Sequence, residues 1–387
     1  MEAADLVTLQ PQIGIGSTSP DRDGAPEVSV IVPARNEEAC LADCLRSLVD
    51  QPGPAYEVIL VDDHSTDSTR AIAESFCSPT LSQKTRKDGA PTIRVLSAGE
   101  LPHGWNGKCS AVWSGAKAAK GKWLLFTDAD TRHSPDSIAR GMQEAQAAGA
   151  DMLSYSPRQE VHGFAERALM PVIFAELAKA YPPKDVCDPK SPVAAANGQY
   201  LLIRREAYDA VGGHAAVATA LLEDVELAKR LKRAGFKLRF SMSDAVSTRM
   251  YRSFPQMWEG WTKNLALLFP NPRKLALWRA LEFLAIVAMA CFSVVALSHG
   301  NLVVFAVLAA LTVLGLYVFG RRIGRAHFDR LSNILAFFGL PLFAVLLFNS
   351  SISLRRGSVR WKGREYSGST ETQPSGETEV VAEKTFL

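Results

Sequence analysis

Residues 123–131 read W-L-L-F-T-D-A-D-T, an apolar run that ends in two carboxylates, Asp128 and Asp130. A buried apolar run that stops at polar residues is typical of a parallel strand whose carboxyl end faces a ligand site. Two carboxylates at this spacing can present oxygen ligands to a divalent cation that carries a diphosphate. A short Asp-x-Asp triplet also arises by chance as a solvated turn, so the rest of the chain must supply a nucleotide site and a base.

Strand and helix patterns alternate around this stretch. We expect strands at 28–32, 56–61, 93–96 and 123–127, and helices at 36–49, 68–76 and 111–119. The alternation predicts an α/β fold with a mostly parallel sheet. Three of the strands are followed by polar segments, at 33–37, 62–63 and 128–130. Because the carboxyl ends of parallel strands meet at one edge of a sheet, we expect the three segments to form one site.

Composition limits the class of protein. The 387 residues carry 43 Lys and Arg against 40 Asp and Glu, and this small net charge of +3 gives no reason to expect nucleic acid as a partner. None of the six cysteines has metal-ligand spacing, and we expect a reducing compartment. Cys40 and Cys44, four residues apart, are expected to be small buried side chains on one helix face. We expect residues 1–26 to be a flexible leader without a secretory signal, and residues 367–387 to be disordered.

The pattern changes after the fourth strand. We expect an amphipathic helix at 164–181, a strand at 199–203 and a helix at 221–234 whose first turn carries two acids, Glu223 and Asp224. Acids at a helix start also favour the helix dipole, which is an alternative explanation for this pair. Aromatic residues then gather at 251–269, and Trp258 and Trp261 among them are candidate acceptor contacts or simply core residues.

From residue 280 the chain is dominated by apolar side chains. Segments 280–297 and 302–319 are each about long enough to cross a bilayer, and 331–354 is a third candidate. Arginine clusters follow the second and third segments, and three complete spans would place them on opposite sides of the membrane. Either the third segment is re-entrant or interfacial, or one cluster lies against head groups. Burial of all three in a soluble domain is the remaining alternative.

Four blocks occur in an order that resembles family 2 of the inverting glycosyltransferases. They are V-S-V-I-V-P-A-R-N-E-E at 28–38, V-I-L-V-D-D-H-S-T-D-S-T at 58–69, T-D-A-D at 127–130 and L-E-D at 222–224. Segments 104–108, 257–261 and 361–364 further resemble a membrane-bound branch often found beside hopanoid and carotenoid genes. The resemblance implies a GT-A fold over residues 27–270, with a nucleotide-binding half at 27–131 and an acceptor half at 132–270, followed by a membrane region at 280–354.

The family also implies roles for individual residues. Pro33, Arg35 and Glu37 would border the nucleotide, and Asp63 would accept a hydrogen bond from the base, which favours uridine because its ring N–H is a donor. Asp128 would hold the ribose or donor sugar, and Asp130 would bind Mg²⁺ or Mn²⁺, which neutralises the leaving diphosphate.

Two further residues complete the expected chemistry. Lys108 would add positive charge near the diphosphate, or it is a solvated lysine on a glycine-rich turn. Asp224, next to Glu223, would be the general base that takes the proton of the acceptor. Processive relatives carry an arginine where this chain has Gly260, so we expect a single sugar addition rather than chain elongation.

The resulting prediction is an inverting, metal-dependent transfer of a sugar to a lipid hydroxyl, with a UDP-sugar as the expected donor. The enzyme would be a multi-pass protein of the inner (plasma) membrane with its catalytic domain in the cytoplasm. A polyprenyl-phosphate acceptor is one alternative, and its ionised phosphate would need no strong base. A sugar nucleotidyltransferase would need a glycine-rich loop after the first strand, which is missing, and a non-catalytic membrane scaffold would not need the acids.

Overall fold

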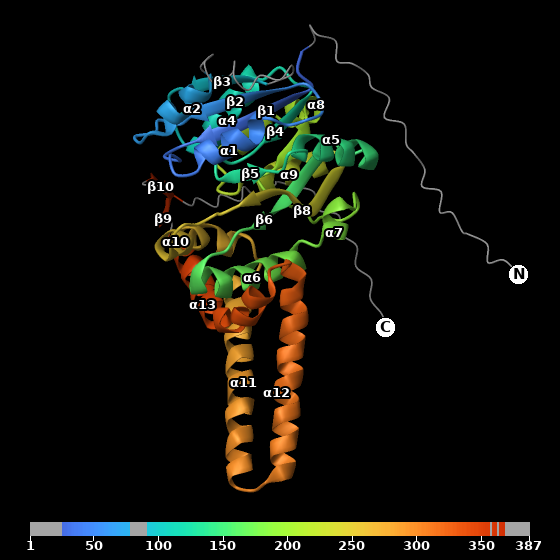
Figure 1. The fold of residues 1–387 in the computed structure, drawn as a ribbon, viewed down its shortest axis with the longest axis vertical. Helices are drawn as coiled ribbons and strands as arrows, with labels where there is room; N and C mark the ends of the chain where they lie inside the picture. Colours follow the sequence, from blue (N-terminus) through green and yellow to red (C-terminus); the bar gives the residue numbers. More distant parts are fainter. Residues whose placement is uncertain (1–24, 78–90, 357, 362–363, 368–387) are drawn as a thin grey trace, which may run out of the picture.

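The computed structural model describes residues 25–77, 91–356, 358–361 and 364–367. An α/β domain forms one end of the molecule, and two long helices project from its base as a stem (Figure 1). The predicted leader at 1–26, apart from its last two residues, and the predicted tail at 367–387, apart from Ser367, lie outside the described residues.

One eight-stranded sheet runs through the α/β domain in the order β3-β2-β1-β4-β7-β6-β8-β5. Its strands are β1 Val28–Ala34, β2 Tyr56–Asp62, β3 Thr92–Ser97, β4 Trp123–Phe126, β5 Thr131–His133, β6 Met152–Gln159, β7 Leu201–Arg204 and β8 Leu238–Thr248. Pairing is parallel among β3, β2, β1 and β4 and between β6 and β8, whereas β7 and β5 run antiparallel to their neighbours. The predicted fold class, α/β with a mostly parallel sheet, is confirmed.

Helices cover both faces of the sheet, and the long helices α11 and α12 form the stem below it (Figure 1). Within the described residues the helices are α1 Leu41–Val49, α2 Thr69–Cys77, α4 Gly107–Ala118, α5 Ser137–Ala148, α6 Gly163–Ala180, α7 Pro183–Cys187, α8 Arg205–Ala210, α9 Glu223–Arg233, α10 Phe254–Asn264, α11 Pro272–Ser298, α12 Leu302–Ile323 and α13 Arg330–Arg355. Three short 3₁₀ segments lie at Gly213–Val217, Leu265–Leu267 and Gly324–Ala326, and a hairpin of β9 Ser358–Trp361 and β10 Arg364–Ser367 follows α13.

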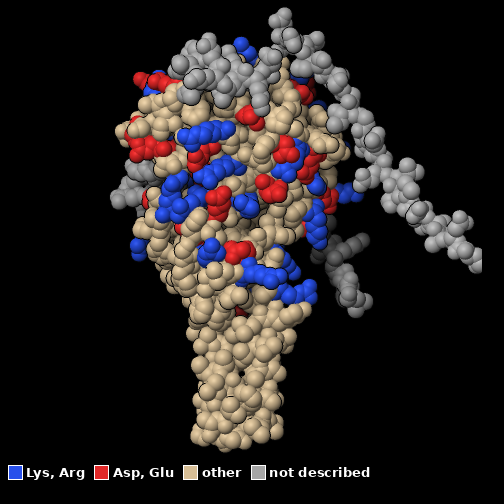
Figure 2. Space-filling view, in the orientation of Figure 1, with Lys and Arg blue, Asp and Glu red and all other residues tan. Residues whose placement is uncertain are grey.

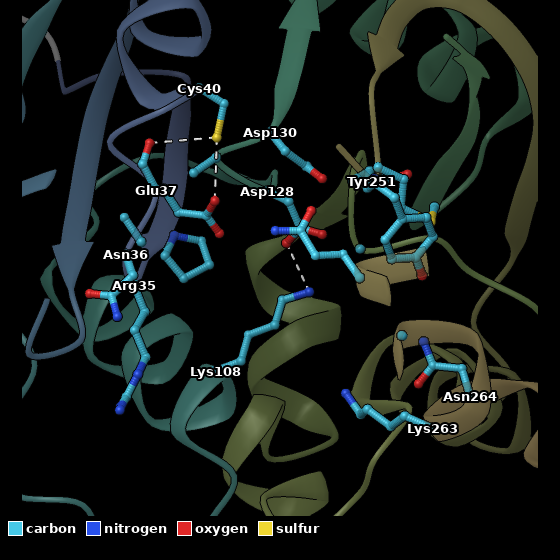
Figure 3. A pocket seen from close by; sticks show the side chains of 18 of the residues that line it. Arg35, Asn36, Glu37, Cys40, Lys108, Asp128, Asp130, Tyr251, Lys263 and Asn264 are labelled. Carbon is cyan, nitrogen blue, oxygen red and sulfur yellow. Dashed lines mark hydrogen bonds and ion pairs between the residues drawn. The ribbon is translucent and has the colours of Figure 1, made fainter. Parts of the chain in front are cut away.

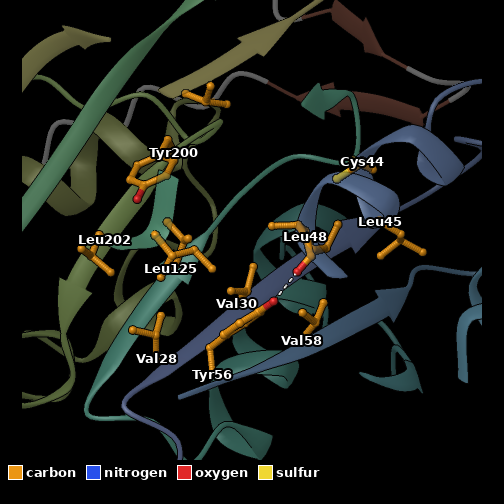
Figure 4. Close-up of a cluster of buried hydrophobic side chains, with 14 of the residues drawn as sticks. Val28, Val30, Cys44, Leu45, Leu48, Tyr56, Val58, Leu125, Tyr200 and Leu202 are labelled. Atoms are coloured by element: carbon orange, nitrogen blue, oxygen red, sulfur yellow. Dashed lines mark hydrogen bonds between the residues drawn. The ribbon is translucent and has the colours of Figure 1, made fainter. Parts of the chain in front are cut away.

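The core follows from the two-residue period of the strands. Val28, Val30 and Val32 of β1 point into the cluster beneath α1 and α5, whereas Ile31 points into the cluster beneath α4 and α9. Figure 4 shows the first cluster, in which the Tyr56 hydroxyl donates a hydrogen bond of 2.7 Å to the Leu48 carbonyl oxygen. Burial on both faces explains why these strands read as continuous apolar runs.

Two predicted helix starts are wrong, each for a local reason. The helix expected from residue 36 begins at Leu41, because Asn36 has a left-handed backbone (φ 54°) and a turn follows it. The helix expected from residue 111 begins at Gly107, because Asn106 caps it and accepts a hydrogen bond from the Lys108 backbone N–H.

The helix predicted at 164–181 is present as α6, but its middle is buried all round rather than amphipathic. Helix α6 is buried on every side from Ala168 to Glu176. Helix α13 covers it so closely that a Cβ atom at Gly339 would overlap the Ala168 carbonyl oxygen. The apolar stripe of α6 is therefore core.

Helices α11, α12 and α13 are each long and apolar enough to cross a membrane. The stem formed by α11 and α12 shows no charged side chain over its projecting length, whereas charges gather on the α/β domain above it (Figure 2). The predicted membrane region of C-terminal apolar helices is confirmed in this sense, and soluble-domain burial of all three segments is wrong, since α12 leaves most of its surface exposed.

Candidate active site

The carboxyl ends of β1, β2 and β4 meet at one cavity of about 560 Å³, as the polar segments after these strands predict. Helices α4, α9 and α10, with the segments 197–199 and 249–252, supply most of the rest of its wall. Nine of the predicted site residues line it: Pro33, Arg35, Glu37, Asp63, Lys108, Asp128, Asp130, Glu223 and Asp224.

The end of the cavity formed by β1 and β2 holds Asp63. This carboxylate is only 7% exposed, and its Oδ2 lies 3.5 Å from the Arg35 guanidinium. The Asp63 backbone N–H donates to the Ala34 carbonyl oxygen at 2.8 Å, which joins the ends of the two strands. The loop beside it is also tied down, because Asn36 Oδ1 accepts a hydrogen bond of 2.8 Å from the Thr66 backbone N–H. A rigid carboxylate at this place can read an N–H donor of a base.

Lys108 joins three elements at the centre of the cavity. Its Nζ lies 2.8 Å from Asp128 Oδ1, after β4, and 2.9 Å from Glu223 Oε1, in the first turn of α9. Figure 3 shows the lysine reaching from α4 to Asp128. Burial alone would lower the pKa of Lys108, but the nearby carboxylates raise it well above its usual value. Lys108 is therefore a positive charge paired with two carboxylates of the cavity, and its role near a diphosphate stays a prediction.

Asp224 is held by the backbone. Its Oδ2 accepts a hydrogen bond of 2.8 Å from the Gly198 N–H, and its Oδ1 accepts one of 2.8 Å from the Val225 N–H. Burial, with the negative charge of Glu223 next, raises the pKa of Asp224 to about 6, although Lys108 acts in the opposite direction. A carboxylate with a pKa near 6 is ionised at neutral pH and can still take a proton.

Glu223 behaves in the opposite way. Burial by itself would raise the pKa of its carboxyl, but the positive charges of Lys108 and Lys263 lower it to about 2. The adjacent acids of α9 therefore divide into a permanent anion and a group that titrates near neutrality, a division typical of acid–base sites. Both acids also lie at the N-terminus of α9, so the helix dipole and the cavity act on the same pair.

Asp128 and Asp130 follow β4 and offer carboxylate oxygens to the cavity, where Asp130 is the predicted metal ligand. Within the described residues, no three His, Cys, Asp or Glu side chains are arranged to hold a metal ion by themselves. Mg²⁺ is commonly bound through one or two carboxylates together with substrate phosphates, so this result fits a cation that binds with its nucleotide. The donor set is all oxygen, which suits Mg²⁺ or Mn²⁺.

Helix α10 contributes cavity residues that the sequence reasoning missed. Gln256, Glu259, Gly260, Lys263 and Asn264 line the cavity at helical spacing, so they form one face of α10. Figure 3 shows Lys263 and Asn264 across the cavity from Arg35 and Asn36. Burial lowers the pKa of Lys263, against the opposing effect of Glu223. The spacing of Gln256, Glu259 and Lys263 was the available signal, because it marks a polar face on an otherwise aromatic helix.

Trp258 and Trp261, predicted as acceptor contacts, do not line the cavity. Trp261 is 4% exposed, and its indole N–H donates to the Met170 sulfur at 3.3 Å, so its ring belongs to the core between α6 and α10. Trp258 packs against the same core. Tyr251 lines the cavity instead, and it fits because Gly260 has no side chain: a Cβ there would collide with the Tyr251 ring. The acceptor role of the two tryptophans stays a prediction.

Comparison with family models gives two overlapping matches. Residues 29–212 match the model described as glycosyl transferase family 2. Residues 123–350 match the model described as glycosyl transferase family group 2, and this second match extends from β4 into α13.

Curated relatives carry the name 4,4'-diaponeurosporenoate glycosyltransferase. The protein of Staphylococcus haemolyticus (strain JCSC1435) is 31% identical over 255 residues, which are 62% of this chain and 61% of the relative. The chain thus spans less than two thirds of that relative. The protein of Staphylococcus aureus (strain USA300) is 26% identical over 362 residues, 89% of each chain.

Solved structures with a similar chain course include two glycosyltransferases. A mannosyltransferase from Pyrobaculum calidifontis, in complex with GDP-Man and Mn²⁺, is 17% identical with a TM-score of 0.48, and the match covers 87% of this chain and 89% of that one. Glucosyl-3-phosphoglycerate synthase from Mycobacterium tuberculosis, in complex with Mn²⁺, UDP and glucosyl-3-phosphoglycerate, is 21% identical with a TM-score of 0.39, over 63% and 78% of the two chains.

Proposed function

The chain belongs to glycosyl transferase family group 2, and from this premise we propose that it transfers one sugar from a nucleotide-sugar to a lipid acceptor at the membrane surface. The observation that carries the proposal is the single cavity in which Asp63, Lys108, Asp128, Asp130 and Asp224 meet. These residues come from separate elements, and each has the chemistry that one part of the transfer needs.

The donor lies along the carboxyl ends of β1, β2 and β4. Asp63 accepts the ring N–H of the base, which favours uridine, and Pro33, Arg35 and Glu37 border the nucleotide. Asp128 is fixed by Lys108 at 2.8 Å, so its second carboxylate oxygen can accept a hydrogen bond from a ribose or sugar hydroxyl. Asp130 would hold a Mg²⁺ or Mn²⁺ ion, and such a cation would neutralise charge on the departing diphosphate.

Positive side chains of the chain itself support the leaving group. Lys108 stays protonated because three carboxylates surround it, and Lys263 adds a second ammonium from the opposite wall. Both are preorganised where negative charge develops as the bond between the sugar and the diphosphate breaks.

Asp224 is the general base. The acceptor hydroxyl transfers its proton to the Asp224 carboxylate while its oxygen attacks the anomeric carbon from the face opposite the diphosphate. A single displacement inverts the configuration at that carbon. The raised pKa of Asp224 favours a hydroxyl acceptor, because an ionised acceptor such as a polyprenyl phosphate has no proton to remove.

The lipid nature of the acceptor is supported by the apolar stem below the α/β domain and by relatives named for diaponeurosporenoate. Arg321, Arg322 and Arg325 lie at the base of the stem, and such arginine clusters favour the cytoplasmic side of the inner membrane. They therefore support a cytoplasmic position of the catalytic domain. Gly260 stands where the resemblance to processive relatives would put an arginine, and a Cβ at this position would already collide with the Tyr251 ring, which supports a single addition.

The test is incubation of membranes that contain the enzyme with labelled UDP-glucose, UDP-galactose, UDP-N-acetylglucosamine and GDP-mannose, followed by mass spectrometry of the lipid extract. We expect one UDP-sugar to label one apolar lipid with a single sugar, and the Asp224→Asn variant to lose this product. Transfer to a polyprenyl phosphate would favour the alternative acceptor. Absence of transfer from every donor, with equal amounts of folded protein, would favour the scaffold alternative.

A further inference from the structure

The three apolar helices differ in how much of their surface the protein covers. In the most apolar 18-residue window of each helix, 6% of the residues are buried in α12 and 17% in α11, but 44% are buried in α13. By length and hydropathy, each of the three helices could span a membrane. Burial separates α13 from the other two.

Helix α13 is fastened to the base of the α/β domain at its beginning. The Asp329 carboxylate, which caps the helix, lies 3.2 Å from the Arg167 guanidinium at the start of α6. Arg167 also donates a hydrogen bond of 3.3 Å to Ser332. In the middle of the helix, Gly339 lets the α13 backbone approach Ala168 of α6.

The end of α13 is fastened to the same domain. The Asn349 amide donates to the Thr262 hydroxyl at 3.2 Å, and the Ser350 hydroxyl donates to the Thr262 carbonyl oxygen at 2.7 Å. Ser351 accepts a hydrogen bond of 3.1 Å from Arg273 at the start of α11. Since contacts run from Asp329 to Ser351, the helix stays beside the domain over about 33 Å of its length. A helix so placed cannot carry the chain to the far side of a bilayer.

The opposite face of α13 is apolar and exposed. Its large exposed side chains repeat at helical spacing and form one stripe: Leu331, Ile334, Phe338, Val345 and Phe348. A helix with one face on the domain and one apolar face uncovered is typical of a helix that lies in the membrane interface.

A buried ion network marks the root of the stem. Arg279 and Glu282 of α11, Arg322 of α12 and Glu176 of α6 form four ion pairs with N–O distances of 2.7 to 3.3 Å. Below this network, α11 continues from Glu282 to Ser298, about 24 Å of helix. The turn at its tip, His299–Gly300–Asn301, is polar and exposed. A stem of this length nearly matches the roughly 30 Å apolar core of a bilayer.

We propose that, among the helices that the structure describes, only the α11–α12 hairpin crosses the membrane, and that α13 lies in the head-group layer on the side of the catalytic domain with its exposed stripe in the lipid. The partner of this surface is the near leaflet of a bilayer. Arg321, Arg322 and Arg325 before α13 and Arg355 and Arg356 at its end then lie on the same side, which removes the conflict between the two arginine clusters.

The test introduces one cysteine at a time and labels it with a membrane-impermeant maleimide, in intact cells and in inverted vesicles. Peptide mass spectrometry then reports which cysteines have reacted. His299→Cys reports the tip of the hairpin, and Arg356→Cys reports the end of α13. The natural Cys77 is exposed on the α/β domain and marks the catalytic side within the same molecule. We expect Arg356→Cys to react only from the face where Cys77 reacts, and His299→Cys only from the opposite face.

Three membrane spans predict the reverse for Arg356→Cys, so its reaction from the face opposite Cys77 would overturn the proposal. Failure of Arg356→Cys to react from either face would do the same, because that position would then lie in hydrocarbon. Reaction of His299→Cys from the Cys77 face, or from neither, would overturn the crossing of the hairpin. The pattern is read without any sugar transfer, so its failure is distinct from failure of the proposed function.

Discussion

The ammonium of Lys108 lies 2.8 Å from Asp128 Oδ1. This ion pair joins the first turn of α4 to the loop after β4, which ends at Phe126. The same ammonium is 2.9 Å from Glu223, so one lysine sets the distance between the donor side of the cavity and the first turn of α9. The position of Lys108 depends on the Asn106 cap, since Asn106 Oδ1 accepts a hydrogen bond from the Lys108 backbone N–H and the Asn106 N–H donates to the Ala218 carbonyl oxygen.

Replacement of Lys108 by methionine should therefore release Asp128 and remove a positive charge from the cavity. We expect kcat to fall by about 10²- to 10³-fold, the range seen when one preorganised donor at a developing charge is removed. Lys117, exposed on the same helix, gives the matched control Lys117→Met, whose kcat should stay near that of the unchanged enzyme. The measurement is the steady-state transfer rate of each variant with the preferred donor, and equal rates for both variants would contradict the role of Lys108.

The pH dependence of kcat/KM should report Asp224. A base with a pKa of about 6 is active when ionised, so activity should be complete above that pH and fall as pH decreases through it. The negative charge of Glu223 raises this pKa, so Glu223→Gln should move the acidic limb to lower pH. The positive charge of Lys108 lowers it, so Lys108→Met should move the limb to higher pH, in whatever activity remains.

Asp224→Asn should lose activity by about 10²- to 10⁴-fold at every pH, because the amide cannot accept the proton. Shifts of the acidic limb in the same direction for Glu223→Gln and Lys108→Met would mean that the limb belongs to another group.

Asp130→Asn should weaken the binding of Mn²⁺ together with the nucleoside diphosphate. Asp130 lines the cavity and offers a carboxylate oxygen, whereas the amide is a weaker ligand for a hard cation. Mn²⁺ binding is measured by electron paramagnetic resonance in the presence of UDP, and transfer is measured in parallel. Asp244→Asn is the control, because the Asp244 side chain is 78% exposed on β8 away from the cavity. Unchanged Mn²⁺ affinity in Asp130→Asn would remove Asp130 from the metal site.

Lys263→Met tests whether α10 belongs to the catalytic site. The ammonium lines the cavity, and Glu223 and Asp224 act on its pKa, so its removal leaves more uncompensated negative charge where the diphosphate binds. We expect a KM for the donor at least about 10-fold higher, which corresponds to roughly 1.4 kcal/mol. An unchanged KM with reduced kcat would instead place Lys263 on the acceptor side.

The residues of the site that directly follow strands could be predicted from the sequence. Asp63, Asp128 and Asp130 follow apolar runs, and the geometry of a parallel sheet alone brings such residues to one edge. Lys263 and Gly198 could not be found in this way. Gly198 reaches the cavity from the loop before β7. Lys263 lies on a polar face of α10 that its spacing marks, but the packing against α6 and α13 that turns this face toward the cavity is not encoded in the local sequence.

In the membrane region, too, the sequence did not predict how the helices pack. Hydropathy and length identify α13 as apolar, but they do not reveal whether lipid or protein covers each face of a helix. Gly339 and Pro341 both lie inside this segment, yet helix α13 is continuous and Gly339 serves close packing against α6.

Gly339→Ala should separate α13 from α6. A methyl group at this position would overlap the Ala168 carbonyl oxygen, which is backbone within a buried helix and cannot move aside easily. We expect a loss of about 1–3 kcal/mol in stability, the usual cost of overpacking. Gly320→Ala in α12 is the matched control, since no atom lies within 4 Å of its added methyl and alanine favours a helix by about 1 kcal/mol. Thermal unfolding in one detergent compares the two, and equal melting temperatures would contradict the close contact between α13 and α6.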